Sequence, residues 1–297
     1  MKSIKRAICL LALIGVSMIF VLITGASPAY DLKVRTDHPP LNDKEAYVKW
    51  MLSKTDTDEI FLQQRWDRLQ QDVIWYNDQP DVLKECFLRT PREKFARDYN
   101  KKNAYTHSAL PIEDGQTISG PHIQIRMTLA ILPSPDMKVL EIGTGSGNQA
   151  AMLAQLSNHV YTIEIKKNAF NVTKGIYEEL KTKYPEYKNV HMVNADGYYG
   201  WKQEYGWDEE GPIEFDRIIV TCGIDHIPPP LLNQLKPDGI MVIPVGTRNS
   251  QAILKITKKV DDKGNITILR EDIYGGRIRD TFVPFTDNEG GVHAKNW

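Results

Sequence analysis

The sequence predicts an α/β fold: a mostly parallel central sheet with helices on both faces and an antiparallel hairpin at its C-terminal end. From residue 138 onward, short apolar segments alternate with longer helical ones, which is typical of parallel strands that are covered on both faces. Near the end of the chain the apolar period changes to two on either side of a turn at residues 261–265, which indicates a hairpin. A glycine-rich turn also follows the first strand directly, as in nucleotide-binding sheets.

The N-terminal segment has a different character from the rest of the chain. Three basic side chains precede an uncharged run at residues 7–26, and about 20 apolar residues in a helix are long enough to cross a bilayer. Small residues at 27–29 suit a signal peptidase. We therefore expect residues 1–29 to be a signal peptide or a membrane anchor. Because the positive charges precede the run, the body of the protein is expected to be exported or anchored on the periplasmic side.

Residues 30–80 are predicted to form a linker and a helical extension. Residues 31–42 are polar and contain prolines, as in a linker, and two helical stretches follow. The second stretch carries apolar side chains every three or four residues, which are Leu62, Trp66, Leu69, Val73 and Tyr76. We expect this helix pair to pack on the main domain, which is predicted to span residues 81–297.

The main domain is expected to begin with helices and a loop. Asp81 is the predicted cap of a helix that ends before Pro91, because proline cannot continue a helix. A loop rich in turn formers, residues 110–120, then leads into a helix that has Pro121 at its first position and runs to about Leu132.

The later elements follow from apolar runs that are bounded by turn residues. The predicted strands are residues 139–142, 160–165, 190–194, 217–221, 240–245, 252–257, 266–273 and a last one at 281–284. The predicted helices among them are residues 149–156, 167–184 and 229–235.

Charge and cysteine content limit the classes of partner. The formal net charge is −1 and no basic stripe is present, so the sequence does not indicate a nucleic-acid surface. Cys9 lies in the apolar N-terminal run, and Cys86 and Cys222 stand in separate apolar contexts. Isolated cysteines of this kind are more often core residues than parts of a disulfide or metal site. Since no His, Cys and acid cluster has ligand spacing, we expect no metal.

The glycine-rich turn is the predicted ligand site. Glycine permits positive φ and a close approach of the backbone to a ligand; the turn comprises Gly143, Thr144, Gly145, Ser146 and Gly147. Glu141 lies two residues before the first glycine and suits a ligand with an amino-acid end and a positive charge. Glu164 ends the next strand, where an acid accepts both hydroxyls of a ribose. Together they imply S-adenosylmethionine; the alternative is a structural turn beside two solvated acids.

Four ordered blocks of the sequence resemble one enzyme family. They are residues 88–95 with Pro-Arg-x-x-Phe, residues 110–122 with Thr-Ile-Ser at 117–119, residues 140–151 with the glycine turn, and residues 216–246. The chain is identified by these blocks, over roughly residues 82–287, as similar to the protein-L-isoaspartate O-methyltransferases. That resemblance implies the Rossmann-like fold of class I methyltransferases. The chain departs from the family pattern at Gly120, at Asn148, at residues 222–226 and in an insertion at 201–214.

The resemblance also implies roles for individual residues. Ser119, with Thr117 as a second donor, would hold the carboxylate that accepts the methyl group, although its residue type alone favours a helix cap. Asp196 and Gly197 would contact the adenine of the cofactor. Thr286 matches a family position near the substrate loop and is assigned to the cofactor site.

The activity that the resemblance implies is repair of damaged proteins: methyl transfer from S-adenosylmethionine to the free α-carboxylate of L-isoaspartyl residues. A carboxylate has a pKa of about 4 and needs no general base, in agreement with the absence of a Ser/His/Asp arrangement.

Two alternatives stay open, a methyltransferase for a different small acceptor and a tethered cofactor-binding module without turnover. We expect a monomer whose partner is an isoaspartyl protein. A cytoplasmic location also stays open, because the cofactor is made there.

Overall fold

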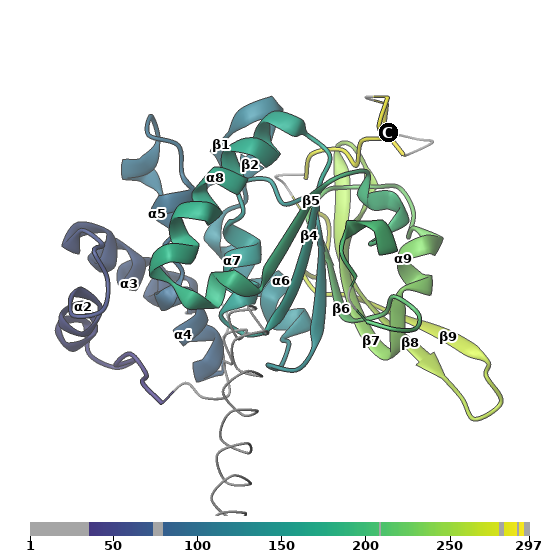
Figure 1. The fold of residues 1–297 in the computed structure, drawn as a ribbon, viewed down its shortest axis with the longest axis horizontal. Coiled ribbons are helices and arrows are strands. Elements are labelled where there is room, and N and C mark those ends of the chain that lie inside the picture. The colour runs from purple at the N-terminus through teal and green to yellow at the C-terminus, as the bar shows by residue number, and fades with distance from the viewer. Residues whose placement is uncertain (1–35, 74–79, 208, 279–281, 290, 294–297) are drawn as a thin grey trace, which may run out of the picture.

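The computed structural model describes residues 36–73, 80–207, 209–278, 282–289 and 291–293, and it has the predicted α/β architecture (Figure 1). The apolar run at residues 7–26 lies outside these residues, so its role as a signal peptide or anchor stays a prediction. Within the described part of the chain, every helix is too short or too polar to cross a membrane.

A single large sheet forms the centre of the fold. In the described residues it has seven strands in the order β5-β4-β3-β6-β7-β8-β9. They are β3 (Lys138–Ile142), β4 (His159–Glu164), β5 (Val190–Asn194), β6 (Phe215–Val220), β7 (Leu235–Thr247), β8 (Ser250–Val260) and β9 (Ile266–Asp272). The first five strands in that order are parallel, and β8 and β9 continue the sheet antiparallel. The fold class predicted from the sequence is confirmed.

The predicted last strand at residues 281–284 is wrong. Residue 281 lies outside the described residues, and Pro284 makes only an isolated bridge with Gly223. Its proline nitrogen has no hydrogen to donate to a ladder, which limits pairing at this position. Phe282, Val283 and Pro284 instead line the cavity described below.

Alternating side chains of the strands face two separate cores. In β3, Val139 belongs to one cluster of buried side chains and Leu140 to the other, and in β4 Val160 and Tyr161 divide in the same way. The helices α6 (Pro121–Ile131), α7 (Asn148–Ala154) and α8 (Lys167–Lys183) cover the first face, and α9 (Pro229–Asn233) lies on the second (Figure 1). Because successive side chains of a strand point to opposite faces, both faces of the sheet are covered and the fold has three layers.

The tryptophan-rich insertion folds back onto the second face of the sheet. Trp201 and Trp207 are buried there, and both rings contact Tyr161. The insertion therefore extends the core and does not contribute a tryptophan to the cavity described below.

The N-terminal extension packs against the first face of the domain. It consists of α2 (Lys44–Leu52) and α3 (Glu59–Val73), and the domain itself begins with α4 (Asp81–Arg89) and α5 (Arg92–Phe95). Pro80, and not Asp81, is the N-cap of α4, with no side-chain cap bond. A buried ion pair ties the extension to the domain, since Arg65 of α3 lies 3.0 Å from Glu93 of α5.

Candidate active site

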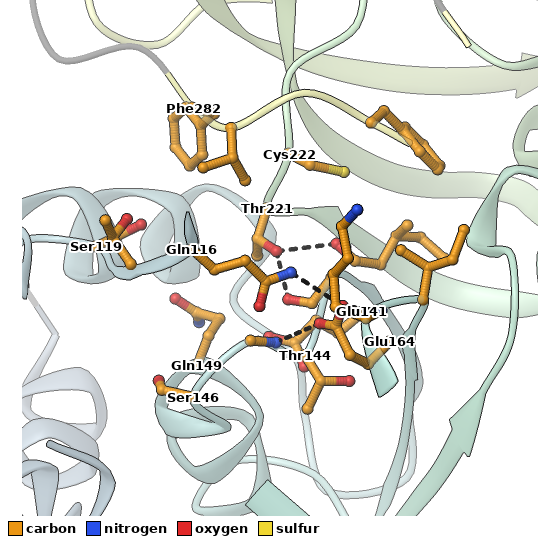
Figure 2. A pocket seen from close by; sticks show the side chains of 18 of the residues that line it. Gln116, Ser119, Glu141, Thr144, Ser146, Gln149, Glu164, Thr221, Cys222 and Phe282 are labelled. Atoms are coloured by element: carbon orange, nitrogen blue, oxygen red, sulfur yellow. Dashed lines mark hydrogen bonds between the residues drawn. The ribbon is translucent and has the colours of Figure 1, made fainter. Parts of the chain in front are cut away.

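The candidate site lies at the carboxyl ends of β3 and β4. The order of the strands reverses here, because β4 lies on one side of β3 and β6 on the other, and open α/β sheets bind ligands in the crevice at such a point. A cavity of about 200 Å³ is lined there by the glycine turn, by residues 114–119 and by residues 282–286 (Figure 2). Three segments that are far apart in the sequence thus meet at one site.

The glycine turn has the backbone geometry that its sequence predicts. Gly143, Gly145 and Gly147 have φ angles of 95°, 51° and 88°, which strain any residue with a Cβ. A Cβ at Gly143 would also lie 2.5 Å from the hydroxyl oxygen of Thr221. Gly147 does not line the cavity: it is the N-cap of α7, and a Cβ there would lie 2.7 Å from side chains of α8. Its role is packing and not ligand contact.

Glu164 fixes the glycine turn by hydrogen bonds. One carboxylate oxygen accepts from the backbone N–H of Gly145 (2.7 Å), and the other accepts from the backbone N–H of Lys166 (2.8 Å) and from Nε2 of Gln116 (2.9 Å). Burial raises the pKa of Glu164, and these bonds oppose that rise. A carboxylate has about four lone-pair positions, so three are used and one is left. A ribose diol, which brings two donors, would require Gln116 to release its bond.

Glu141 is a fully buried acid that borders the same cavity. One of its oxygens accepts from the hydroxyl of Thr162, and the other, Oε1, has no hydrogen-bond partner in the described part of the chain. Burial raises its pKa to about 8, while the bond from Thr162 lowers it. A buried oxygen without a partner is costly, and a cationic ligand group would remove that cost.

Glu141→Gln is expected to flatten the pH dependence of stability in the protein without cofactor. Between a pKa of about 4.3 in the unfolded chain and about 8 in the folded protein, the folded state holds a proton that the unfolded chain has released. The contribution of this group is therefore complete below the unfolded pKa and is lost as the pH rises through the folded one. Denaturant unfolding at about pH 6 and about pH 9 checks this. Equal losses in the wild type and in the variant would contradict it.

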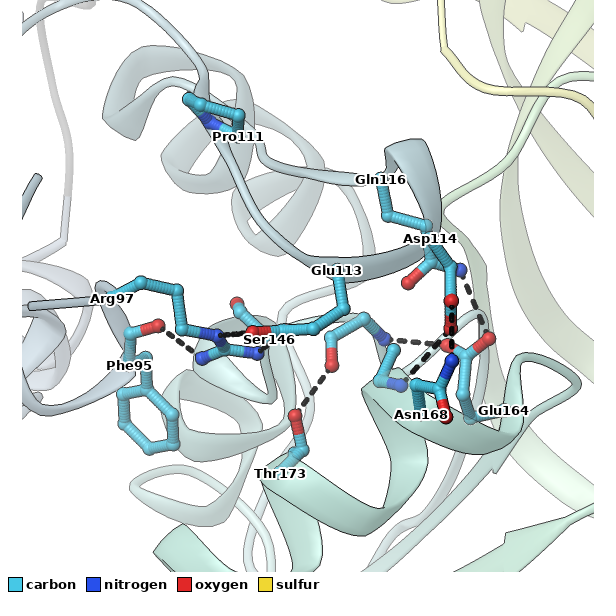
Figure 3. A network of polar contacts seen from close by, with 12 residues as sticks. Phe95, Arg97, Pro111, Glu113, Asp114, Gln116, Ser146, Glu164, Asn168 and Thr173 are labelled. Atoms are coloured by element: carbon cyan, nitrogen blue, oxygen red, sulfur yellow. Dashed lines mark hydrogen bonds and ion pairs between the residues drawn. The ribbon is translucent and has the colours of Figure 1, made fainter. Parts of the chain in front are cut away.

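The loop that carries the predicted acceptor residues is fastened over the turn. It is flanked by β1 (Leu110–Pro111) and β2 (Thr117–Ile118), which pair with each other. Arg97 pairs with Glu113 and holds the pKa of that carboxyl below its usual range. Asp114 accepts from the backbone N–H of Ala169 at the start of α8 (3.2 Å). These contacts hold the loop next to the glycine turn (Figure 3).

Ser119 and Thr117 both line the cavity, as the sequence predicts. Residue type alone favours a capping role for Ser119, but Gly120 is the N-cap of α6 and no side-chain cap bond is made. The half-buried Ser119 hydroxyl is therefore not used to start the helix. The two residues also border a second chamber of about 360 Å³, whose described lining includes His107, His122 and Arg277.

His122 is part of a stacked pair. Its ring lies 3.8 Å from the ring of His107, nearly parallel to it. A Cβ at Gly120 would lie 2.4 Å from the backbone oxygen of His107, so the glycine at this position allows the His107 segment to approach. The stacking gives His122 a role in the wall of the second chamber that requires no proton transfer.

Asp196 and Gly197, the two residues predicted to contact the adenine, differ in their positions. Gly197 lines the cavity, and so does Thr286, which was predicted for the cofactor site. Asp196 does not line it, because one of its oxygens accepts from the backbone N–H of Tyr198 (2.9 Å) and the other lies 2.8 Å from Nε2 of His293. In this arrangement Asp196 orders the turn and the C-terminal tail.

The unusual segment at residues 222–226 divides between the core and the surface. Cys222 is buried and lines the cavity. Asp225 and His226 pair with each other (2.7 Å), and His226 contacts the hydroxyl of Tyr198 (3.0 Å). Neither of them lines the cavity or the second chamber, so the altered charges of this segment do not face the predicted substrate.

Several lining residues were not predicted from the sequence. They are amides and one aromatic residue that the fold brings to the cavity: Gln116, Gln124, Gln149 and Phe282. Gln116 adjoins the Thr-Ile-Ser motif, which is the one signal that indicates it. An isolated glutamine carries no pattern of its own, and its partner Glu164 is 48 residues away.

Comparison with known proteins agrees with this geometry. The family model described as Protein-L-isoaspartate(D-aspartate) O-methyltransferase matches residues 67–290. The chain is 37% identical to "Protein-L-isoaspartate O-methyltransferase 2" of Shewanella sediminis, over 70% of this chain and 80% of that one. It is 41% identical to "Protein-L-isoaspartate O-methyltransferase" of Opitutus terrae, over 74% and 86%.

Solved structures show the same fold. A Plasmodium falciparum structure, described as a putative protein-L-isoaspartate O-methyltransferase in complex with S-adenosyl-L-homocysteine, is 24% identical with a TM-score of 0.58, over 75% of this chain and 98% of that one. The family match, which covers most of the described residues, decides the assignment: this chain belongs to the protein-L-isoaspartate O-methyltransferase family.

Proposed function

We propose that this protein transfers a methyl group from S-adenosylmethionine to the free α-carboxylate of L-isoaspartyl residues in damaged proteins. The observation that carries the proposal is the composition of the cavity. Two buried acids, Glu141 and Glu164, line it together with the hydroxyl-bearing residues Thr117 and Ser119, and Ser119 lies apart from the two acids (Figure 2). The family to which the chain belongs, and its relatives' names, support the same reaction.

The donor set of the cavity fits S-adenosylmethionine. Glu141 offers an unpartnered buried oxygen to a positively charged group, and the backbone of the glycine turn leaves room for the amino-acid part of the ligand. Glu164 offers its oxygens to the ribose hydroxyls once Gln116 releases the one oxygen to which it donates. When bound, this cofactor supplies an electrophilic methyl group on a sulfonium. The family neighbour from Plasmodium falciparum, which holds S-adenosyl-L-homocysteine, supports this assignment.

The acceptor needs orientation more than activation. A carboxylate with a pKa of about 4 is ionised at neutral pH, so the protein has no proton to remove. The Ser119 and Thr117 hydroxyls can each donate a hydrogen bond to it and aim one of its oxygens into the cavity. Correct orientation of two reactants lowers an activation barrier by about 7–11 kcal/mol. A site without a general base can therefore accelerate the transfer by holding the two reactants in line.

Ser119→Ala is expected to lower kcat/KM for an isoaspartyl peptide about ten- to a hundredfold, which is the loss of one hydrogen bond to a charged group. The affinity for S-adenosylmethionine should change little, because Ser119 lies on the acceptor side of the cavity. Steady-state kinetics and calorimetric titration of the cofactor measure the two effects separately. An unaltered kcat/KM would remove Ser119 from the acceptor site.

The class of acceptor is tested with methyl-labelled S-adenosylmethionine. Purified protein is incubated with an isoaspartyl peptide in one arm and with small carboxylic acids in the other. The proposal predicts label in the peptide. Label in the small acids alone would identify a methyltransferase for a different acceptor, and cofactor binding without transfer to any acceptor would identify a binding module.

A further inference from the structure

Arg92 is a buried arginine directly behind the acceptor loop. It lies in α5 and is 1% exposed. Its Nη2 donates to the backbone oxygen of Ser119 (2.9 Å), and its other donors reach the backbone oxygen of Ala104 and Oε1 of Gln124. All three acceptors are neutral, and no ion pair joins Arg92 to a carboxylate of the described residues.

The neighbouring carboxylates cancel the charge of Arg92 only in part, through the electrostatic attraction of Asp72. Glu93 is paired with Arg65 at 3.0 Å. Asp72 lies 3.6 Å from Arg68 and 3.6 Å from His107. Both carboxylates therefore lie closer to other cations, and neither forms an ion pair with Arg92 in the described part of the chain. Burial lowers the pKa of Arg92 to about 10, so the guanidinium still carries its charge at neutral pH.

The buried ionisable side chains are therefore distributed unevenly across the site. Glu141 and Glu164 lie on the cofactor side, while Arg92 lies behind Ser119 on the acceptor side; Asp114 and Lys166, which also line the cavity, are not buried. The second chamber follows the same trend, because its described lining contains Arg277 and no carboxylate. A fixed positive charge acts strongly over a short distance in a water-poor interior, and it favours an anion over a neutral group.

We propose that Arg92 is a positioning residue for the acceptor carboxylate: its guanidinium fixes the backbone of Ser119, and its charge, which no ion pair neutralises in the described part of the chain, favours a carboxylate at the Ser119 side of the cavity. This inference rests on the proposed function, since it identifies the group that the charge favours. It also assigns a role to the polar residue Asn148, whose Nδ2 donates to the same oxygen of Gln124 (2.8 Å). Asn148 and Arg92 together hold Gln124 of α6, the helix that begins just after Ser119.

Substitution of Arg92 separates its effect on the acceptor from its effect on the cofactor. In the full chain, Arg92→Met is expected to raise KM for an isoaspartyl peptide about ten- to a hundredfold, the range for hydrogen bonds that involve a charged group. The dissociation constant for S-adenosylmethionine should stay within about twofold. Arg92→Lys keeps the charge but not the three-way bonding, so it should recover part of the loss.

Arg217→Met is the matched control. Arg217 is half-buried and, like Arg92, donates to a backbone oxygen; its acceptor is Ile131, at the end of α6 that lies far from Ser119. It should leave the peptide KM unchanged. If Arg217→Met raised the peptide KM as much as Arg92→Met, the effect would be general loosening of α6 and the inference would be overturned.

Gln124→Glu tests the charge without removing Arg92, in case Arg92 variants fail to fold. Glutamate keeps the acceptor oxygen that Arg92 and Asn148 use and adds a compensating negative charge. The inference predicts a folded protein whose peptide KM is raised while its cofactor affinity is not weakened. An unchanged peptide KM would contradict it. Wild-type protein that methylates no isoaspartyl peptide would instead overturn the proposed function, so the two failures are distinguishable.

Discussion

Glu164→Ala is expected to weaken binding of S-adenosylmethionine by at least about a hundredfold, which corresponds to ~2.7 kcal/mol. The substitution removes the acceptor for the backbone N–H of Gly145 and Lys166 and for Gln116, so the glycine turn is no longer held in place and the ribose would lose the partner that we propose for it. Isothermal titration measures the loss, and circular dichroism checks that the variant is folded.

The isosteric variant Glu164→Gln is the control for the shape of the site. Its amide keeps one acceptor oxygen but cannot accept from both sides, so we expect an intermediate affinity. If Glu164→Ala bound the cofactor as tightly as the wild type, Glu164 would be a structural residue only and the assignment of the cofactor site would be wrong.

Breaking the buried pair of Arg65 and Glu93 is expected to cause the largest loss of stability. Arg65→Met leaves Glu93 buried without its cation, and both side chains are at most 1% exposed. Removing one partner of a buried pair costs about 3–5 kcal/mol in the free energy of unfolding, or about 6–20 °C in Tm for a domain of this size. Denaturant and thermal unfolding measure both quantities.

Two further variants show whether burial is the cause. Arg65→Met combined with Glu93→Leu should recover most of the loss, because no buried charge is left without a partner. Lys44→Ala breaks the pair of Lys44 and Asp67, whose side chains are 38% and 53% exposed, and should cost less than about 1 kcal/mol. A loss for Arg65→Met that was as small as that for Lys44→Ala would contradict the account of the extension.

Local patterns in the sequence were sufficient to predict the sheet. A period of two or a short apolar run marks each strand, and the glycines at 143, 145 and 147 require a turn whatever surrounds them. The structure places Glu141 and Glu164 on one cavity for the same reason, since both lie near the carboxyl ends of neighbouring parallel strands. Features that depend on one strand and the turn after it were therefore accessible.

Features that depend on pairing between distant side chains were not accessible. Asp196 was expected at the adenine, but the C-terminal tail brings His293 to its carboxylate from 97 residues away. Arg92 carries no local signal of its burial, because its acceptors come from three separate segments. Ser119 is intermediate: its type indicates a cap, the family motif indicates a site, and the backbone of Gly120 at the N-cap leaves its hydroxyl free of the capping role.

The central claim is that the acceptor is the free α-carboxylate of an isoaspartyl link, and one measurement tests it directly. Methyl transfer from labelled S-adenosylmethionine is compared for two peptides of identical sequence, one with an isoaspartyl link and one with the normal aspartyl link. We expect base-labile methyl ester on the isoaspartyl peptide, and kcat/KM for that peptide at least about a hundredfold above that for its isomer. Equal methylation of the two peptides, or of neither, would contradict the account.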